Sequence, residues 1–307
     1  MEIYRRLEKL YLFHRQGEFR CLFVPGAEFS LIADDIDKAR LKAFCSVAPE
    51  ANLNSDLDGR DPSYWHILIL SPDNRLLGGQ RLRFSLNSGH WSSATSYLEY
   101  SYPGITSVLN EDQRPFVEVG RVFVTSYARG DHRILPLLLK LSSLVAQHYG
   151  YKSILGLMSY TYISSKNIPA ILFLDILQQG IDASDLALMI PAPRHPSILK
   201  RLPSNLRPSK IPFVDLRACS LHQVVSLVNA EMGNAKYLST EKSPFRIPPF
   251  LSVHSRLSHA VPIGLSEALG YNLIHEILME TDLCNDSKGA THPCTQSPLT
   301  DLPASLC

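Results

Sequence analysis

The sequence lacks the charge surplus that marks many classes of binding protein. Its 307 residues include 30 Lys and Arg against 29 Asp and Glu, which gives a formal net charge of +1. Proteins that bind nucleic-acid phosphates normally carry a clear excess of basic residues. Nucleic acid is therefore not an expected partner. Charged residues make up 19% of the chain and apolar residues 45%, values typical of a soluble globular protein with a sizeable core.

Long apolar runs are also missing. No stretch of about 18 apolar residues occurs, so a membrane-spanning helix is not expected. The longest apolar segment, Ile168–Leu177, is interrupted by Pro169 and Asp175. The first ten residues are charged, favour a short helix and lack the apolar core of a signal peptide. We expect a cytoplasmic protein, and an apolar face leaves open a peripheral contact with a membrane surface.

Motifs for metals and for a serine nucleophile are absent as well. The six cysteines are scattered, with no C-x-x-C pair and no Cys/His cluster at metal-ligand spacing. Asp56, Asp58 and Asp61 resemble a calcium loop in composition only, because the required Gly and terminal Glu are missing. We interpret Pro49–Asp61 as a solvated loop. No G-x-S-x-G elbow is present. A metal site is not expected.

Alternating and helical patterns predict an ordered array of elements. The predicted strands are Phe19–Val24, Tyr64–Leu70, Leu76–Phe84, Phe116–Thr125, Ser153–Met158 and Leu186–Ile190, and the predicted helices are Phe29–Cys45, Ile134–Tyr149 and Ser164–Gln179. Ser85–Arg114 is expected to be irregular. The order β-α-β-β-β-α-β-α-β over residues 19–190 indicates an α/β (α+β) fold.

The rest of the chain is less regular. A strand at Ile211–Leu216 and helices at Leu221–Met232 and Leu265–Met279 are expected there. We predict one domain over residues 1–190 and an extension over 191–284 that packs on or completes it. Residues 285–307 are polar and rich in Pro and Ser, which predicts a disordered tail.

The strand, turn and helix over residues 116–149 form the most informative unit. Backbone N–H groups at a helix N-terminus bind anions, phosphates in particular. Arg129, His132 and Arg133 add positive charge beside Gly130. One candidate ligand is the phosphate of a pantetheine arm. The alternative is a plain strand-to-helix connection with surface arginines.

Glu118 lies within this strand, among apolar residues. In a regular strand Glu118, Gly120 and Val122 share one face, while Val119 and Arg121 take the other. A simple Glu118–Arg121 ion pair is therefore not expected.

The segment E118-V-G-R-V-F-V-T-S-Y-A-R-G130 resembles the E-x-G-R-x-x-V-x-P-x-Y-R-x-G signature of GNAT-superfamily acyltransferases. The most similar group comprises ornithine-lipid and N-acyl amino acid synthases. The related acyl-homoserine-lactone synthases carry a similar Glu–Arg pair on this strand. Leu77–Leu82 resembles the group's V-x-G-x-x-R-L strand, Gly156–Ser159 its G-x-x-S, and Ile247–Leu251 a late P-P-L element. The resemblance covers residues 19–160 well and later parts in patches.

The sequence departs from the family pattern at several positions. Ser126 stands where the family usually has Pro, and Ala128-Arg129 is shifted relative to Y-R. The usual phosphate loop, Q/R-x-x-G-x-G/A, is degenerate, with Asp131 and His132 in place of small residues. This favours acyl carrier protein over coenzyme A as the carrier of the donor. Arg40–Phe44 fits an element of the lactone synthases, but no Trp follows closely.

The resemblance implies a GNAT-like mixed, mostly antiparallel sheet flanked by helices, with an irregular C-terminal extension. It implies an N-acyltransferase that moves an acyl group, of long chain in our reading, from an acyl carrier protein or coenzyme A thioester to the amine of an amino acid or similar metabolite. The thioester is a donor substrate, and no permanently bound cofactor is implied. Ile134–Tyr149 and the C-terminal third would line an acyl tunnel. The rivals are an acyl-homoserine-lactone synthase and a non-catalytic binding module of the same fold.

The resemblance also implies roles for individual residues. Glu118 would be the general base, since an attacking amine must lose a proton. Tyr160, with Tyr162 as its alternative, would protonate the leaving thiolate. Arg81 would bind an acceptor carboxylate, and Arg121 and Ser159 would complete the substrate site. The donor would bind along Phe123, Val124 and Thr125, whose N–H groups polarise the thioester, and at Arg129, Gly130, His132 and Arg133. The alternatives are non-catalytic: Glu118 and Arg81 would be surface residues, and Tyr160 would be a core residue.

Overall fold

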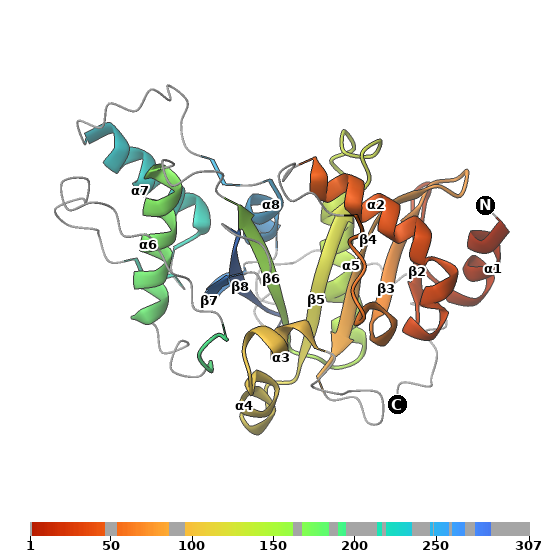
Figure 1. Ribbon diagram of the computed structural model, residues 1–307, viewed down its shortest axis with the longest axis horizontal. Helices are drawn as coiled ribbons and strands as arrows, with labels where there is room; N and C mark the ends of the chain where they lie inside the picture. Colours follow the sequence, from red (N-terminus) through yellow and green to blue (C-terminus); the bar gives the residue numbers. More distant parts are fainter. Residues whose placement is uncertain are drawn as a thin grey trace. The chain divides into compact units, whose positions relative to one another are not determined.

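The computed structural model (Figure 1) describes residues 2–46, 54–85, 96–161, 168–183, 190–194, 214–216, 219–234, 246–247, 249–257, 260–267 and 274–283. The chain forms two compact units. Unit 1 comprises residues 1–97, 110–155 and 282–307, and unit 2 comprises 98–109 and 156–281. The expected boundary at residue 190 stays a prediction, and the predicted tail lies outside the described residues.

The described part of unit 1 contains five strands that follow one another in space as they do in the chain. They are β1 (Leu12–Gln16), β2 (Phe19–Val24), β3 (Trp65–Leu70), β4 (Leu76–Phe84) and β5 (Phe116–Val124). Each pairs with the next in antiparallel fashion. The helices of this unit are α1 (Glu2–Tyr11), α2 (Ala33–Cys45) and α5 (Ile134–His148), with 3-10 turns η1 (Gly26–Leu31) and η3 (Asp61–Ser63).

The strands of unit 1 bury side chains on both faces, because helices cover each face (Figure 1). On one face, Phe23 and Ile69 pack with Leu138 and Leu141 of α5. On the other, Leu68 packs with residues of α1 and α2. We call these the α5 face and the α2 face. Alternation along each strand sends successive side chains to opposite faces, so β3 contributes Ile67 and Ile69 to one core and Leu68 and Leu70 to the other.

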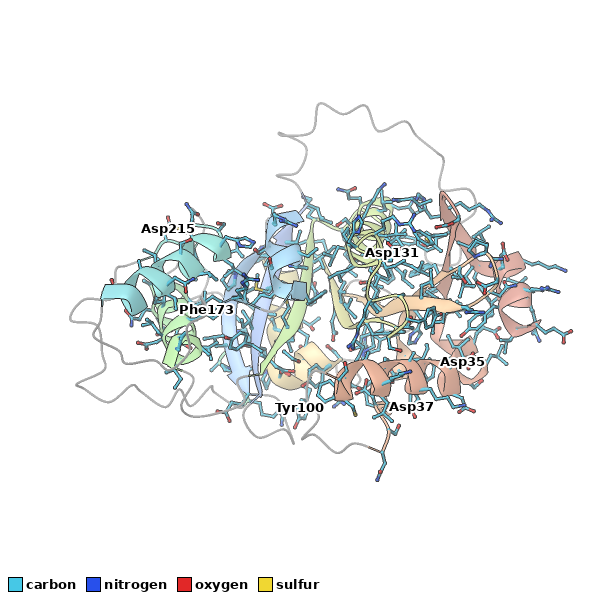
Figure 2. All side chains as sticks on the ribbon, turned by 90° about the horizontal axis from the view of Figure 1, so that it is seen from above. Asp35, Asp37, Tyr100, Asp131, Phe173 and Asp215 are labelled. Atoms are coloured by element: carbon cyan, nitrogen blue, oxygen red, sulfur yellow. The ribbon has the colours of Figure 1, made fainter. Side chains whose placement is uncertain are left out.

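Unit 2 contains a second sheet segment and its own core. Most of β6 (Ser153–Thr161) belongs to it, with β7 (Val261–Glu267) and β8 (Ile274–Asp282) in the order β6-β8-β7. Its helices are α6 (Ile168–Asp182), α7 (Leu221–Asn234) and α8 (Pro249–Leu257), and α3 (Tyr97–Ser101) and α4 (Ile105–Glu111) lie mostly within it. Figure 1 shows α6 and α7 side by side, and Phe173, labelled in Figure 2, is fully buried in this core.

The expected fold class is confirmed: helices flank a mostly antiparallel sheet. The strands β2 and β4 begin and end where the patterns predicted, and β3, β5 and α5 differ by one residue at one end. The short helices α3 and α4 lie in a stretch expected to be irregular. The strand expected at Leu186–Ile190 falls almost wholly outside the described residues, as does most of Ile211–Leu216, whose described part is not a strand.

The helix expected at Leu265–Met279 is wrong, because this segment supplies parts of β7 and β8. Leu265, Leu269 and Leu273 fall at helical spacing by coincidence. Each strand separately shows dense burial: β7 is buried from Pro262 to Ser266. Two short buried strands cannot be told from one buried helix by apolar content alone.

Among the described residues, no helix is long and apolar enough to cross a membrane. The same residues contain no group of three or more His, Cys, Asp and Glu side chains that could hold a metal ion.

Candidate active site

Glu118 is the third residue of β5 and is 4% exposed. Its Oε1 accepts a hydrogen bond from the Tyr64 hydroxyl at 2.7 Å, and its Oε2 accepts one from Ser96 Oγ at 2.7 Å. Hydroxyl donors thus hold both carboxylate oxygens, which fixes the orientation of the side chain. The structure therefore holds Glu118 in place on the α2 face.

Tyr64 is fully buried at the junction of η3 and β3. Its hydroxyl accepts a hydrogen bond from the Tyr97 backbone N–H at 2.9 Å while it donates to Glu118. Burial, together with the neighbouring Glu118 charge, raises the pKa of Tyr64 far above its usual value. The phenol stays protonated, so it serves Glu118 as a fixed hydrogen-bond donor.

Arg121 changes the face pattern of β5. Its φ is 51°, the left-handed region that non-glycine residues rarely occupy, and the β4–β5 register shifts opposite it. This is a β-bulge, in which one extra residue interrupts the alternation. As a result Arg121 shares the α2 face with Glu118, and Val122 packs with the α5 face. The expectation that Val122 shares the face of Glu118 is wrong for this reason.

The bulge brings Arg121 to the aspartate-rich loop rather than to Glu118. Its Nη1 contacts Asp56 Oδ1 at 2.5 Å, and its Nη2 contacts Asp58 Oδ2 at 3.2 Å. A non-glycine residue in this backbone region costs of the order of 1 kcal/mol. Strain of this kind persists where surrounding contacts fix it, here two carboxylates on one guanidinium.

The loop itself forms a buried ion-pair network. Asp56 and Asp61 bind Arg40 of α2, with Nε–Oδ2 and Nη1–Oδ1 distances of 2.8 and 3.0 Å. Asp58 and Asp61 bind Arg81 of β4, at 3.0 and 2.7 Å. The solvated loop expected at Pro49–Asp61 is therefore wrong within its described part, because Asp61 is fully buried and Asp56 is 7% exposed.

The network favours ionised side chains. Burial on its own would raise the pKa of Asp58 and of Asp61, but the Arg81 guanidinium, with Arg121 and Arg40, holds both carboxyls below their usual range. Burial acts against the charge of Arg81 too, yet Tyr64, Asp58 and Asp61 together raise its pKa. The Arg81 guanidinium also stacks on the Tyr64 ring, 4.3 Å from the centroid.

Local hydrogen bonds fold the loop against α2. Asp37, labelled on α2 in Figure 2, accepts from the Asp56 backbone N–H at 2.7 Å and from Ser55 Oγ at 3.0 Å. Within the loop, the Asp58 N–H donates to Asp61 Oδ2 at 3.0 Å. Side-chain bonds to nearby backbone of this kind are typical of Asp in turns.

His66 lies beneath the network on β3, stacked on Phe29 at 4.7 Å between ring centroids. Its Nε2 is 2.9 Å from the Asp61 carbonyl oxygen. Burial lowers the pKa of His66 to about 4, so the ring is neutral at neutral pH and donates this hydrogen bond. The expectation that His66 is a packed histidine is confirmed.

The end of β5 leads into the expected donor-binding turn. The Thr125 N–H donates to the Leu77 carbonyl at 2.9 Å, and Gly78 lies opposite Val124. Because paired residues in an antiparallel ladder alternate between bonded and non-bonded, the Val124 N–H points away from β4. Among the residues predicted to polarise a thioester, Thr125 therefore uses its backbone N–H in the β4–β5 pairing. The Val124 N–H does not bond to β4.

The turn after β5 places the four predicted arm-binding residues at the start of α5. Arg129, Gly130, His132 and Arg133 are all exposed. Arg133, however, binds Asp131 at 2.7 Å and Glu18 at 3.0 Å, and Arg129 donates to the Ala43 carbonyl at 2.6 Å. Asp131, labelled in Figure 2, also accepts from the Arg133 N–H at the helix start. An acidic side chain thus occupies part of the site predicted for a phosphate.

Tyr160 and Ser159 belong to unit 2. Tyr160 is 4% exposed and packs against Phe173, with ring centroids 5.6 Å apart. Burial raises the pKa of Tyr160, which keeps it protonated. Ser159 is exposed. Their predicted roles stay predictions. Tyr162 lies outside the described residues.

The sequence reasoning missed several residues of this site: Tyr64, Ser96, Arg83 and the bound aspartates. Tyr64 was visible only as the first residue of a predicted strand. A face-by-face reading of β3 and β4 would have found the signal, because Tyr64, His66, Arg81 and Arg83 are polar or amphipathic side chains on one face of strands that are apolar on the other.

No protein-family model matches the chain, and no curated protein sequence matches it. Three solved structures show the range of its structural likenesses. The CoA-dependent acyl-homoserine lactone synthase BjaI, solved with SAM and isopentyl-CoA, is 18% identical over 45% of this chain and 65% of its own, at a TM-score of 0.33. FeeM, an N-acyl amino acid synthase from uncultured soil microbes, is 9% identical over 47% and 71%, at 0.31. The ribosomal-protein-S5-alanine acetyltransferase from Vibrio fischeri is 6% identical over 88% and 95%, at 0.36.

By name, these proteins fall in the acyl-transferring classes that the motif resemblance indicated. The matched part spans less than two thirds of the lactone synthase chain. Likenesses with TM-scores below 0.5 say nothing about substrate or mechanism, which therefore have to be argued from the site.

Proposed function

We propose that this protein is an N-acyltransferase. It moves an acyl group from a thioester, carried by acyl carrier protein or coenzyme A, to the amine of an amino acid or similar metabolite. The observation that carries the proposal is the Glu118 carboxylate, buried on β5 and fixed by the Tyr64 and Ser96 hydroxyls. A carboxylate held in this way beside a network of buried arginines is costly to fold and useful as a base.

The reaction needs one proton carried from the amine to the leaving thiol. The acceptor reacts as the neutral amine, and Glu118 takes a proton from its nitrogen, directly or through one water, as that nitrogen attacks the thioester carbonyl. A C–N bond forms and the C–S bond breaks. The thiolate leaves with the electron pair and is protonated by the acid form of Glu118. The products are an amide and a free thiol, and no oxidant or metal takes part.

Charge on the carbonyl oxygen grows in the transition state, so a backbone donor is valuable. Of the three predicted residues, Val124 is the best candidate for this donor, because the Thr125 N–H already donates to the Leu77 carbonyl. The β5–α5 turn lies immediately after Val124, which suits a thioester arm that ends at β5. Val124 and Gly78 are neighbours across β4 and β5, and a side chain on Gly78 would meet the Phe123 carbonyl oxygen at 2.7 Å.

Acyl carrier protein is the donor that the turn favours. Coenzyme A presents a pyrophosphate, whereas the carrier arm has one phosphate. With Asp131 at the start of α5 and Arg133 bound to it, the turn offers less uncompensated positive charge than a pyrophosphate requires. Coenzyme A thioesters stay in the proposal as the second donor class.

The test is product formation from defined substrates. Purified protein is incubated with acetyl, octanoyl and hexadecanoyl thioesters of both carriers and with a mixture of the 20 amino acids. Free thiol and N-acyl products are then measured by mass spectrometry. We expect N-acyl amino acids, with longer chains turned over faster than acetyl. Equal turnover of acetyl and long-chain donors would remove the long-chain part of the proposal.

Two rivals give different products. S-adenosylmethionine in the mixture would yield an acyl-homoserine lactone if the protein were a lactone synthase. A non-catalytic module would bind an acyl thioester without releasing thiol. No thiol release with any donor and acceptor contradicts the proposed function.

A further inference from the structure

The outer face of α1 carries three basic side chains, Arg5, Arg6 and Lys9. All three are exposed, and together with Glu2 they line one hollow of the surface. Lys9 follows the two arginines by three and four residues, which places it one turn further along the same side of the helix. Within the described part of the chain, none of the three cations forms an ion pair or a hydrogen bond, and neither does Glu2.

The other acidic groups around α1 are bound by residues outside this face. Glu8, the second acidic residue of the helix, accepts from Arg15 of β1 at 2.7 Å and from Arg20 of β2 at 2.6 Å. Glu28 of η1 accepts from the Tyr11 hydroxyl at 3.3 Å. These carboxylates therefore do not neutralise the outer face, which presents a surplus of positive charge on a chain whose net charge is only +1.

Packing turns the basic face outward and leaves a leucine beside it. Tyr4 and Leu7 are buried in the core of the α2 face, and Figure 1 shows α1 next to β2 at the end of unit 1. Leu10 is 58% exposed, more than any other large apolar residue in the described ranges. It follows Arg6 by one turn, so an aliphatic side chain stands next to the cations.

This combination does not stabilise the fold. Like charges one turn apart on a helix repel each other, and an exposed leucine gains nothing from the core. The same combination suits a lipid surface, because anionic headgroups attract the cations and an aliphatic side chain enters the boundary between headgroups and acyl chains. An acidic protein would account for the cations, but an exposed aliphatic group beside them favours lipid.

We propose that α1 binds the surface of an anionic phospholipid membrane through Arg5, Arg6 and Lys9, with Leu10 inserted at the headgroup boundary. Tyr4 holds the opposite side of the helix on unit 1, so the helix lies flat on the membrane. The contact is reversible, because the helix has no long apolar chain of the kind that stable anchoring needs. This surface shares no residue with the candidate active site, and its binding to lipid does not depend on the proposed reaction.

The test is cosedimentation of the full chain with vesicles. One set is phosphatidylcholine alone, and the other contains about 30% phosphatidylglycerol. Each basic side chain near an anionic surface strengthens binding about 5-fold, so we expect about 100-fold tighter binding to the anionic vesicles at low salt. Most of this difference should vanish at about 1 M salt, where the Debye length is about 3 Å. Equal binding to both sets at low salt, or binding to neither, overturns the inference.

The variant that removes the charge of the face combines Arg5→Gln, Arg6→Gln and Lys9→Gln. We expect it to bind anionic vesicles about 100-fold more weakly and to keep the melting temperature of the unmodified protein, since all three side chains are exposed. The matched control removes the same number of charges from exposed lysines of α2 and α5, by Lys38→Gln, Lys42→Gln and Lys140→Gln. The control should change binding less than about 3-fold. Equal weakening in both variants would mean that net charge alone acts, and the inference would fail.

Two further measurements separate lipid from a protein partner. Leu10→Ser should weaken vesicle binding about 5-fold, because the apolar contact is lost while the charge is kept. KM for the acyl thioester of carrier protein, measured without vesicles, should be the same in the triple variant of α1 as in the unmodified protein. A raised KM with unchanged vesicle binding would identify a protein-docking face, which overturns the inference and leaves the proposed function standing. Vesicle binding without any acyl transfer would support the inference while the proposed function fails.

Discussion

The two faces of the sheet in unit 1 are built from the same three strands but carry different side chains, apolar on one face and largely charged on the other. On the α5 face, β3, β4 and β5 present Ile67, Leu82 and Val117 to an apolar helix. On the α2 face, the same strands carry His66, Arg81 and Glu118. Arg81 binds the loop of aspartates, and Glu118 accepts a hydrogen bond from the Tyr64 hydroxyl. Strand periodicity alone separates a stabilising core from a charged site.

The comparison teaches where stability and function reside. Apolar burial contributes roughly 25 cal/mol for each Å² removed from water, with no geometric demands. Buried ion pairs return little net stability, because desolvation offsets their attraction. A charged face retained beneath α2 is therefore better explained by chemistry than by folding, and breaking each face should have different consequences.

The largest effect is expected from Asp61→Asn. Asp61 is fully buried and binds Arg40 and Arg81, so the substitution leaves two guanidinium groups poorly compensated. We expect a loss of about 4 kcal/mol in the free energy of unfolding, the cost of removing one partner from a buried pair. Urea unfolding measures it. A loss below about 1 kcal/mol, the value for exposed pairs, would show that water screens the network.

Ile69→Ala breaks the other face. Ile69 is fully buried on β3 and points toward α5. We expect a loss of about 3 kcal/mol from the cavity and the lost transfer energy. Because no charged group is involved, kcat/KM per folded molecule should stay within about 3-fold of the unmodified value. A stability loss matched by a collapse of activity would mean that the two faces are not separable.

His66, on the α2 face, should make the free energy of unfolding depend on pH. Its pKa in the folded protein is lowered to about 4, chiefly by burial. The unfolded chain binds a proton near the usual pKa, so stability is complete above about pH 6.5 and is lost as pH falls toward about 4. Between pH 7 and pH 5 this group should cost about 2 kcal/mol.

His66→Gln should remove that part of the pH dependence. The measurement is urea unfolding of both proteins at pH 7 and pH 5. Asp58 and Asp61 have lowered pKa values and contribute acid loss only at lower pH. An equal drop in both proteins over this window would place the acid-sensitive group elsewhere.

The smallest effect is expected at the turn before α5. Arg133 is exposed and bound to Asp131 and Glu18, so Arg133→Ala should leave the melting temperature unchanged within error. KM for the donor thioester should rise about 2- to 5-fold at low salt, the strength of one charge near a helix N-terminus. The rise should disappear at high salt. A salt-independent change would indicate direct contact with the donor.

Much of the unit 1 fold followed from local pattern. Phe19–Val24 and Leu76–Phe84 are strands with the predicted bounds, because both are apolar and end at turn residues. The hairpin at Leu265–Met279 was missed, since its apolar spacing also fits a helix. The helices α3 and α4 were not predicted, because the stretch that contains them shows no clear periodicity.

The site was less accessible to prediction for a physical reason. Glu118 stood out as a carboxylate in an apolar strand, but the Tyr64 hydroxyl that binds it is 54 residues away in the chain. The bulge at Arg121 could not be inferred, because nothing in its residue type favours a positive φ. Asp56, Asp58 and Asp61 read as a solvated loop because the arginines that bind them come from three separate elements.

The most direct test of the account is the activity of Glu118→Gln with the preferred donor and acceptor. Glutamine keeps the shape and accepts a hydrogen bond but cannot take the proton, so we predict a fall in kcat/KM of about 100- to 10,000-fold. The matched control is Glu280→Gln, which changes a buried glutamate of unit 2. Activity of Glu118→Gln within about 3-fold of the unmodified protein would contradict Glu118 as the base.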